Sequence, residues 1–356
     1  MTPMDFYQRL EDELIDFLPG NNIKSVKYEE VLKDNGVKRP ALRIVSNDIN
    51  ITPTIYLDSF YEEYEMGRSF NSIIREVAVT YTNHKANIGF DLEKITSFDI
   101  VKDNILYRLV NYEKNKEFLQ NAPHRKIEDL ALTYVINVVD QEALHYDSDS
   151  NYIIRITNNI FEGYGVSEEQ LYDVASRNMK VLDPPTLKDL SEVLFGSLGK
   201  DVMQMLEVGE EEARQLIDNA YKTEMKMYVL SSKSTAYGSG HILDPNVMDN
   251  IKKLYGKQYF VIPSSVHECI IVPFNGDYSQ YKMYEEMVRD VNRTQLRESE
   301  ILSNGMYFVD ADRHLFLQAD KAQEVIEKLE LEEKLEQVKK PAEKPIRKPE
   351  IRQPKL

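Results

Sequence analysis

The chain has 356 residues, enough for two or three domains of roughly 100 to 200 residues each. Its residues are 42% hydrophobic and include 22 Tyr and 13 Phe, which excludes a chain that is disordered throughout. The single cysteine, Cys269, excludes an internal disulfide and a cysteine-based zinc site. The sequence starts without the pattern of a secretion signal, and it has no run of about 18 apolar residues. We therefore expect a soluble, cytoplasmic protein with no membrane contact.

Charge is distributed unevenly along the chain, whose formal net charge is −16. The last 18 residues, Lys339 to Leu356, carry a net +5, which leaves −21 on residues 1–338. An acidic body repels phosphates, so duplex nucleic-acid binding by the body is disfavoured. Four prolines punctuate the basic segment, so we expect an extended, flexible tail that is available to an acidic partner or a proline-reading domain.

Residues 1–90 indicate helices around a β-hairpin. Apolar residues at helical spacing predict an amphipathic helix over 5–17, which Pro19-Gly20 ends. Strands at 25–32 and 37–46 flank Asn35-Gly36, a pair that supplies the positive φ values of a tight turn. After this hairpin, residues 55–64 fit either the start of a strand or a helix, and a helix is predicted over 70–82.

Residues 91–222 indicate a middle block of alternating helices and strands. Ser167 and Gln170 have the spacing of a capping box, which predicts a helix from this point to about Met179. Asp183-Pro184-Pro185 should stop it, and one or two acidic helices with a break at Gly196 to Gly199 should follow over 187–221. The other predicted elements are strands at 105–110, 130–139 and 152–157, and helices near Asp91 and at 112–119.

Residues 223–319 have the clearest pattern. Gly238 and Gly240 permit a close backbone approach in the second of two expected paired strands. Asp244-Pro245 predicts the N-cap and first turn of a helix that Gly256 ends. The predicted order is ββαββα plus a hairpin, with strands at 227–232, 237–243, 258–262, 266–274, 306–309 and 314–317, and helices at 245–254 and 279–292.

The fold class predicted from these elements is α+β, with mixed, largely antiparallel sheets and flanking helices in two to three blocks. The charged helix that should follow has only a thin apolar stripe, so we expect it to project from the body. The predicted division is 1–90, helix, hairpin and helices; 91–222, middle α+β block; 223–319, C-terminal α+β domain; 320–338, charged helix; 339–356, disordered Lys/Pro-rich tail.

The densest polar run is Pro263-Ser264-Ser265-Val266-His267-Glu268-Cys269. Ser or Cys beside His and Glu supplies the residue types of a nucleophile, a base and an orienting acid. On a strand, however, Ser265, His267 and Cys269 share one face and Glu268 takes the other, and triads usually combine distant segments. We therefore predict a structural turn between strands, with catalysis as the alternative.

The candidate catalytic residues are weak, and no metal or cofactor site is predicted. His241 and His267 are on strands expected to be neighbours, so they could form a site with Asp244 or Glu268. The preferred interpretation is that each histidine makes its own structural hydrogen bonds. No Gly-x-Gly-x-x-Gly or phosphate-binding lysine loop occurs. None of the six histidines has the spacing of a helical metal site: His84, His124, His145, His241, His267 and His314.

Acidic residues near the last predicted hairpin are a further candidate for cation binding. Asp310, Asp312 and Asp320 supply carboxylates there, but they lack the spacing and the turn glycine of an EF-hand loop. We therefore expect these aspartates to form the local hydrogen bonds that stabilise turns.

Several short segments together resemble one bacterial family, the Domain of Unknown Function 5688 family, over about residues 5 to 318. They are Thr52-Pro53-Thr54-Ile55-Tyr56-Leu57, Tyr61-Glu62-Glu63-Tyr64, Val110-Asn111-Tyr112-Glu113-Lys114-Asn115, Ala122-Pro123-His124 and Pro263-Ser264-Ser265-Val266-His267-Glu268. The resemblance implies an intracellular bacterial α+β protein and names no catalytic residue. A looser resemblance to the YtpQ-like proteins rests on Thr157-Asn158-Asn159, Gly165-Val166-Ser167-Glu168-Glu169-Gln170-Leu171 and Ala175-Ser176-Arg177-Asn178.

Three functional hypotheses remain. The leading one is a non-enzymatic binding or adaptor protein of a bacterial cytoplasm that acts on a protein partner. The first alternative is a hydrolase or metal-assisted enzyme that uses the His241/His267 region. The second is an acidic inhibitor that mimics DNA, which requires a continuous stripe of carboxylates.

Overall fold

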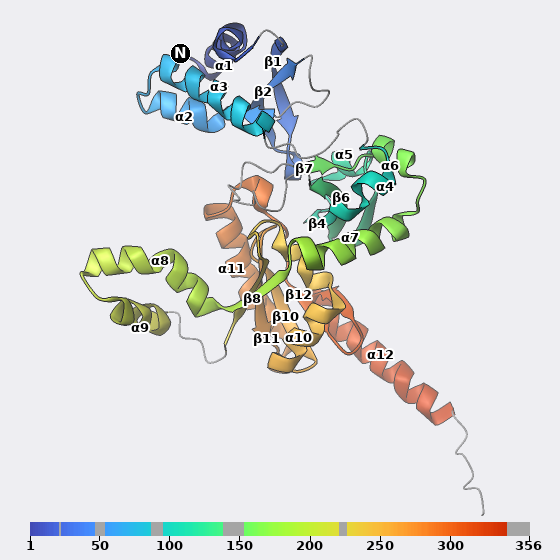
Figure 1. Cartoon of the computed structure of the whole chain (residues 1–356). Helices are drawn as coiled ribbons and strands as arrows, with labels where there is room; N and C mark the ends of the chain where they lie inside the picture. Colours follow the sequence, from blue (N-terminus) through green and yellow to red (C-terminus); the bar gives the residue numbers. More distant parts are fainter. Residues whose placement is uncertain (21–22, 47–53, 87–94, 138–152, 221–225, 340–356) are drawn as a thin grey trace, which may run out of the picture.

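The computed structural model describes residues 1–20, 23–46, 54–86, 95–137, 153–220 and 226–339 (Figure 1). These residues form sheets of three, four and six strands, with antiparallel pairing in each. Helices pack around the sheets, so the fold class is α+β, as predicted. Of the described helices, none has both the length and the apolar run needed to cross a bilayer. The tail predicted from residue 339 lies, from residue 340 on, outside the described residues.

The N-terminal sheet is built on the predicted hairpin. Asn35 and Gly36 at its turn have φ values of 61° and 73°, the left-handed conformation that this residue pair favours. Residues 55–64, which fitted both strand and helix, divide into a strand and a helix at Leu57. The elements are α1 (Pro3–Glu13), a 3-10 helix (Leu14–Phe17), β1 (Ile23–Leu32), β2 (Lys38–Ser46), β3 (Thr54–Tyr56), α2 (Asp58–Glu65) and α3 (Phe70–Ala86).

The middle sheet is centred on β6, whose residues are all buried. The predicted capping box starts α7: Gln170 N–H donates to Ser167 Oγ at 3.2 Å, and Ser167 N–H donates to Gln170 Oε1 at 2.9 Å. β5 is absent from the predicted elements, and the helix predicted at 112–119 is confined to α5. The elements are α4 (Phe98–Val101), β4 (Ile105–Asn111), α5 (Lys116–Leu119), β5 (His124–Ile127), β6 (Leu130–Asn137), β7 (Ile153–Arg155), α6 (Asn158–Tyr164) and α7 (Glu168–Leu182).

The largest sheet has the strand order β13-β12-β10-β11-β9-β8. Its edge strand β8 comes from the predicted middle block, so this sheet joins residues on both sides of residue 222. Asp244 begins α10 as predicted, because its carboxylate accepts the Asn246 N–H at 2.9 Å. The elements are β8 (Pro185–Asp189), α8 (Leu190–Leu206), α9 (Glu210–Ala220), β9 (Tyr228–Ser232), α10 (Pro245–Tyr255), β10 (Gln258–Pro263), β11 (Cys269–Pro273), α11 (Tyr281–Thr294), β12 (Tyr307–Asp310), β13 (Leu315–Gln318) and α12 (Ala319–Lys339).

One predicted strand of this region is a helix. Residues 237–243 form a 3-10 helix (Gly238–Leu243), so the predicted order ββαββα is wrong in its second element. Tyr237 has a φ of 53° and turns the chain back onto β9, where a Cβ on Gly238 would lie only 2.3 Å from the Ser232 nitrogen. The close backbone approach expected of Gly238 is therefore present, but in a tight helical turn.

The helices predicted over 187–221 also differ from the structure. Residues 185–189 pair with β9 as strand β8. α8 then continues without a break through Gly196 and Gly199. Each glycine costs a helix only about 1 kcal/mol relative to alanine, and packing against α9 outweighs that cost.

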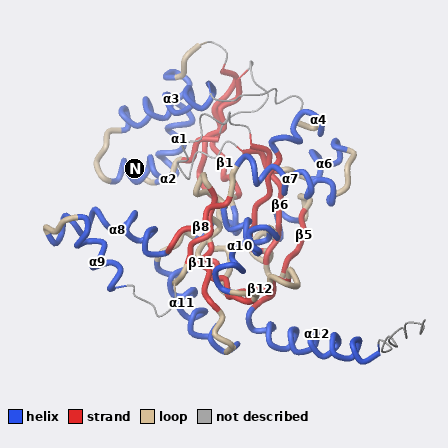
Figure 2. Tube along the Cα trace, turned by 60° about the horizontal axis from the view of Figure 1, so that its bottom comes forward, coloured by secondary structure: helices blue, strands red, loops and turns tan. Residues whose placement is uncertain are grey.

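The C-terminal helix α12 projects from the body, as predicted (Figure 1 and Figure 2). Its first turns are buried at Ala322 and Ile326, whereas Leu331 is exposed. Arg313 holds the helix to the β12–β13 turn, because its guanidinium contacts buried Asp310 at 2.7 Å and Glu333 of α12 at 3.0 Å.

The start of α7 yields a prediction of pH-dependent stability. Glu168 accepts hydrogen bonds from Arg125, at 2.8 Å, and from Tyr134. Burial by itself would raise the pKa of Glu168, but these two bonds outweigh it and lower the pKa below the usual 4.5. The stabilisation is thus present above pH 4.5 and is lost as the pH falls through the lowered pKa.

Glu168→Gln should therefore reduce the free energy of unfolding at neutral pH by about 1 to 2 kcal/mol, and the difference from wild type should shrink in acid. Urea unfolding from neutral to acidic pH measures this. Glu169→Gln is the matched control, since it removes a charge from the same helix turn but is exposed. Equal effects of the two substitutions would show that only the helix dipole matters.

Candidate binding cleft

A cleft of about 310 Å³ lies where the β1–β2 turn and the start of α2 meet Tyr237, the β10–β11 turn and residues 297–300. Its lining is mainly charged, and its apolar residues are two valines. Because five separate chain segments form its walls, the cleft exists only in the folded chain. The lining residues are Lys33, Asp34, Val37, Lys38, Arg39, Asp58, Ser59, Glu62, Tyr237, Val266, His267, Arg297, Glu298, Ser299 and Glu300.

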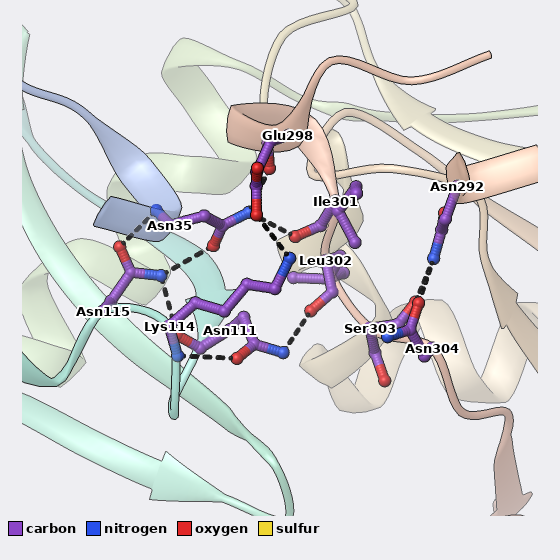
Figure 3. A network of polar contacts seen from close by, with 10 residues as sticks. All are labelled: Asn35, Asn111, Lys114, Asn115, Asn292, Glu298, Ile301, Leu302, Ser303 and Asn304. Carbon is purple, nitrogen blue, oxygen red and sulfur yellow. Dashed lines mark hydrogen bonds and ion pairs between the residues drawn. The ribbon is translucent and has the colours of Figure 1, made fainter. Parts of the chain in front are cut away.

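A pair of asparagines joins the β1–β2 turn, which lines the cleft, to the middle block (Figure 3). Asn35 in the β1–β2 turn donates its N–H to Asn115 Oδ1 at 2.8 Å, and Asn115 Nδ2 donates to Asn35 Oδ1 at 2.9 Å. Asn35 Nδ2 also donates to the carbonyl oxygens of Glu298 and Ile301, at 2.6 and 2.7 Å. One side chain therefore connects the hairpin to the middle block and to the C-terminal wall of the cleft.

Further side chains of the same network extend the connection. Asn111 Nδ2 donates to the Leu302 carbonyl at 3.1 Å, and Lys114 Nζ contacts the Glu298 carboxylate at 3.2 Å. Asn292 of α11 donates to the Ser303 carbonyl at 2.9 Å (Figure 3). Residues 298–303 are thus held from both sides, which fixes this wall of the cleft.

Tyr237 and Asp34 are at the centre of a second polar cluster. The Tyr237 hydroxyl donates to Asp34 Oδ2 at 3.3 Å, and Arg155 contacts Asp34 Oδ1 at 2.7 Å. The guanidinium of Arg108 lies 3.5 Å from the centre of the Tyr237 ring. Burial, and after it the Asp34 carboxylate, raises the pKa of Tyr237 to about 12. The phenol therefore stays protonated at neutral pH and acts as a hydrogen-bond donor.

His267 is the one weak catalytic candidate that lines the cleft. The Tyr237 backbone N–H donates to His267 Nδ1 at 3.1 Å, and the two rings pack edge to face. Burial lowers the pKa of His267, and the resulting decrease is only partly offset by the carboxylates of Glu300 and Asp34. The ring is therefore neutral near pH 7. Since Nδ1 accepts a hydrogen bond, the proton resides on Nε2.

The other three candidates lie outside the cleft lining. His241 is fully buried and donates from Nε2 to the Asp183 carbonyl at 2.8 Å. Asp244 caps α10 and contacts Lys180 at 3.2 Å. Glu268 accepts from Ser264 Oγ at 3.4 Å, and burial raises its pKa. Each of these side chains thus has its own structural contact, and the cleft brings none of them to His267.

The structure confirms the preferred interpretation of the polar run as a turn between strands, but the second strand begins at Cys269 and not at residue 266 as predicted. Residues 264–268 form the turn between β10 and β11, whose strand pairing closes at Pro263 and Cys269. His241 is not on a strand either, because it belongs to the 3-10 helix. Because neither residues 264–268 nor His241 are on a strand, the two faces of a strand do not separate these side chains. Cys269 begins β11 fully buried, and burial raises the pKa of its thiol, so the thiolate does not form near neutral pH.

Sequence reasoning identified His267 but not Asp34, Asn35, Asn115 or Tyr237. The Asn35-Gly36 pair predicted a turn, but it did not predict the contacts that Asn35 makes with other parts of the chain. The run Val110–Asn115 and the run Pro263–Glu268, two of the segments on which the family resemblance rests, supply Asn111, Asn115 and His267. Their role becomes visible only when the fold brings them together.

No group of three or more His, Cys, Asp or Glu side chains in the described ranges is arranged to hold a metal ion. The cleft's acids are instead interspersed with Lys and Arg. Arg39, for example, contacts Asp58 at 2.7 Å.

Comparison with known proteins supplies the family of this chain. Neither the curated proteins nor the solved structures contain a match, so the looser resemblance to the YtpQ-like proteins stays a prediction. A family model, described as a family of unknown function (DUF5688), matches residues 4–311. This match covers most of the chain and includes every residue that lines the cleft. The chain therefore belongs to the family of unknown function DUF5688.

Proposed function

We propose that this protein is a non-enzymatic binding protein of the bacterial cytoplasm that holds a segment of a partner protein in the cleft. The observation that carries the proposal is the hydrogen bond from Tyr237 N–H to His267 Nδ1. It occupies the ring's only lone pair, so His267 offers an N–H donor and not a general base. The Tyr237 hydroxyl already donates to Asp34, so the ring group suited to donate a hydrogen bond to a ligand is the Nε2–H of His267.

The charge of the lining favours a ligand with both signs of charge. Among the described residues, the carboxylates of Glu62 and Glu300 and the ammonium of Lys38 make no ion pair. A simple anion would be repelled by the two carboxylates, and a simple cation by Lys38. A peptide segment that carries acidic and basic side chains can pair with both, while Val37 and Val266 contact its apolar parts. The cleft volume of 310 Å³ fits a few side chains at the lower end of the usual range of ligand sites.

Peptide selection tests this proposal. A phage library of random peptides is selected on the full chain, and the dissociation constants of the enriched peptides are measured by fluorescence anisotropy. We expect enriched peptides to contain both acidic and basic residues, and to bind Glu300→Lys and Lys38→Glu about tenfold or more weakly, which is 1.4 kcal/mol or more.

Glu286→Lys is the matched control. Glu286 is an exposed charge on α11 outside the cleft lining, so its reversal should change the affinity less than about twofold. Selected peptides that bind wild type and both cleft variants equally would overturn the proposal. So would a selection that yields no binder from a diverse library.

A further inference from the structure

The helical arm, formed by α8 and α9, has an apolar helix, α8, that the described chain covers only in part. Nine of the 17 residues of α8 are apolar, yet its only buried residue is Gly199. At its end Met205 is 80% exposed and Leu206 is 54% exposed. A helix with this many apolar residues is ordinarily buried, so this face has the character of a docking surface.

Within the arm, α9 covers part of α8. Ala213 and Ile217 of α9 are buried, and the guanidinium of Arg214 lies 4.0 Å from the centre of the Phe195 ring. None of the side chains of α8 belongs to the hydrophobic clusters of the described residues. Both views show the arm extending away from the rest of the chain (Figure 1 and Figure 2).

Charge identifies the kind of occupant. Residues 190–220 contain seven acidic and two basic residues, with Glu210, Glu211 and Glu212 together at the start of α9. Two such arms repel each other, so direct pairing of arms is disfavoured, and a basic segment is attracted. The chain itself contains one: Lys339 to Leu356 carries a net +5 and includes Ile346 and Ile351 as apolar residues.

The position of α12 indicates a second copy. In both views α12, at whose end the basic segment begins, leads away from the body on the side opposite the arm (Figure 1 and Figure 2). The arm that this segment meets most readily is therefore the arm of another molecule. Each copy then contributes one arm and one basic segment, an arrangement that closes into a ring or continues as a chain.

We propose that the arm of one copy binds residues 339–356 of a second copy, so that the protein self-associates. Opposite charges bring the segment to the arm, and the exposed apolar residues of α8 contact its isoleucines. This self-association does not depend on the peptide-binding role of the cleft. The two proposals can therefore fail separately.

Sedimentation velocity of the full chain tests the self-association with a charge swap. Four substitutions reverse the arm, since Asp201→Lys, Glu207→Lys, Glu211→Lys and Glu212→Lys change the net charge of residues 190–220 from −5 to +3. Four reverse the segment, since Lys340→Glu, Lys344→Glu, Lys348→Glu and Lys355→Glu change its net charge from +5 to −3. Each reversal should weaken self-association about tenfold or more, and the two together should restore it to within about threefold of wild type. Association should also weaken between about 0.1 M and about 1 M salt, as the Debye length falls from roughly 10 to 3 Å.

A control variant tests whether the effect is specific to the arm, and a second variant tests the apolar contact. Glu286→Lys reverses an exposed charge outside the arm and should leave association unchanged, while Met205→Ser with Leu206→Ser should weaken it. All substituted positions named for the arm are exposed, so circular dichroism should show unchanged helix content. A chain that stays monomeric at every concentration, or an association that neither reversal weakens, overturns the proposal, as does a charge swap that fails to restore association.

Discussion

Replacing Asn35 by alanine should lower the free energy of unfolding by about 3 kcal/mol and detach the β1–β2 turn from the cleft wall. The Glu298 and Ile301 carbonyls and the Asn115 amide each lose a partner, at about 0.5 to 1.5 kcal/mol per hydrogen bond. Alanine also has to adopt a φ of 61°, which costs roughly 1 kcal/mol more. Urea unfolding measures the total.

Two further variants separate the causes. Asn35→Gly removes the side chain but accepts the left-handed backbone, so it should be about 1 kcal/mol less destabilising than alanine. Asn275→Ala is the matched control, because this exposed asparagine accepts a local hydrogen bond from the Asp277 N–H two residues away, and it should cost less than about 1 kcal/mol. Hydrogen exchange of β1 and β2 reports local detachment. Unchanged exchange in Asn35→Ala would contradict the role given to this side chain.

Gly238→Ala should be comparably damaging, at about 3 kcal/mol. A Cβ at this position would lie 2.3 Å from the Ser232 nitrogen and 2.6 Å from the Ser231 carbonyl carbon. These atoms belong to β9, which is held on both sides by β8 and β11, so the backbone cannot move away without breaking the sheet. The displaced 3-10 helix should also withdraw the Tyr237 N–H from His267.

Gly196→Ala is the control for this substitution. Gly196 lies inside α8 with nothing within 4 Å of the added methyl group, so alanine should stabilise the chain by about 0.5 to 1 kcal/mol. The midpoints of urea unfolding decide between the two expectations. If Gly238→Ala is as stable as wild type, the close packing of the 3-10 helix on β9 is not rigid.

Local signals in the sequence predicted much of the fold. Local sequence was sufficient to predict the Asn35-Gly36 turn, the Ser167 capping box and the Asp244 N-cap. The few residues that determine each of these features are close together in the sequence. The 3-10 helix after Tyr237 and the strand β8 were not predicted. Both depend on packing against β9, and the local sequence pattern does not predict that packing.

The cleft shows the same division. His267 stood out in a polar run, but the residues that give it a function come from far along the chain. Asn35 meets Asn115 across 80 positions and the Ile301 carbonyl across 266. Asp34 meets Tyr237 across 203. Charge patterns and motifs identify the residue types in the sequence. Which of these residues contact each other is determined by the tertiary fold.

The proposed role of the cleft requires that a ligand binds there and contacts the Nε2–H of His267. The most direct measurement is NMR of imidazole-¹⁵N-labelled full chain during titration with a selected mixed-charge peptide. The free protein should show a neutral His267 with its proton on Nε2 near pH 7. The Nε2 signal should then shift in a saturable way, with the dissociation constant found by anisotropy. Peptide binding that leaves the His267 signals unmoved, or a free ring protonated on Nδ1, would contradict the account.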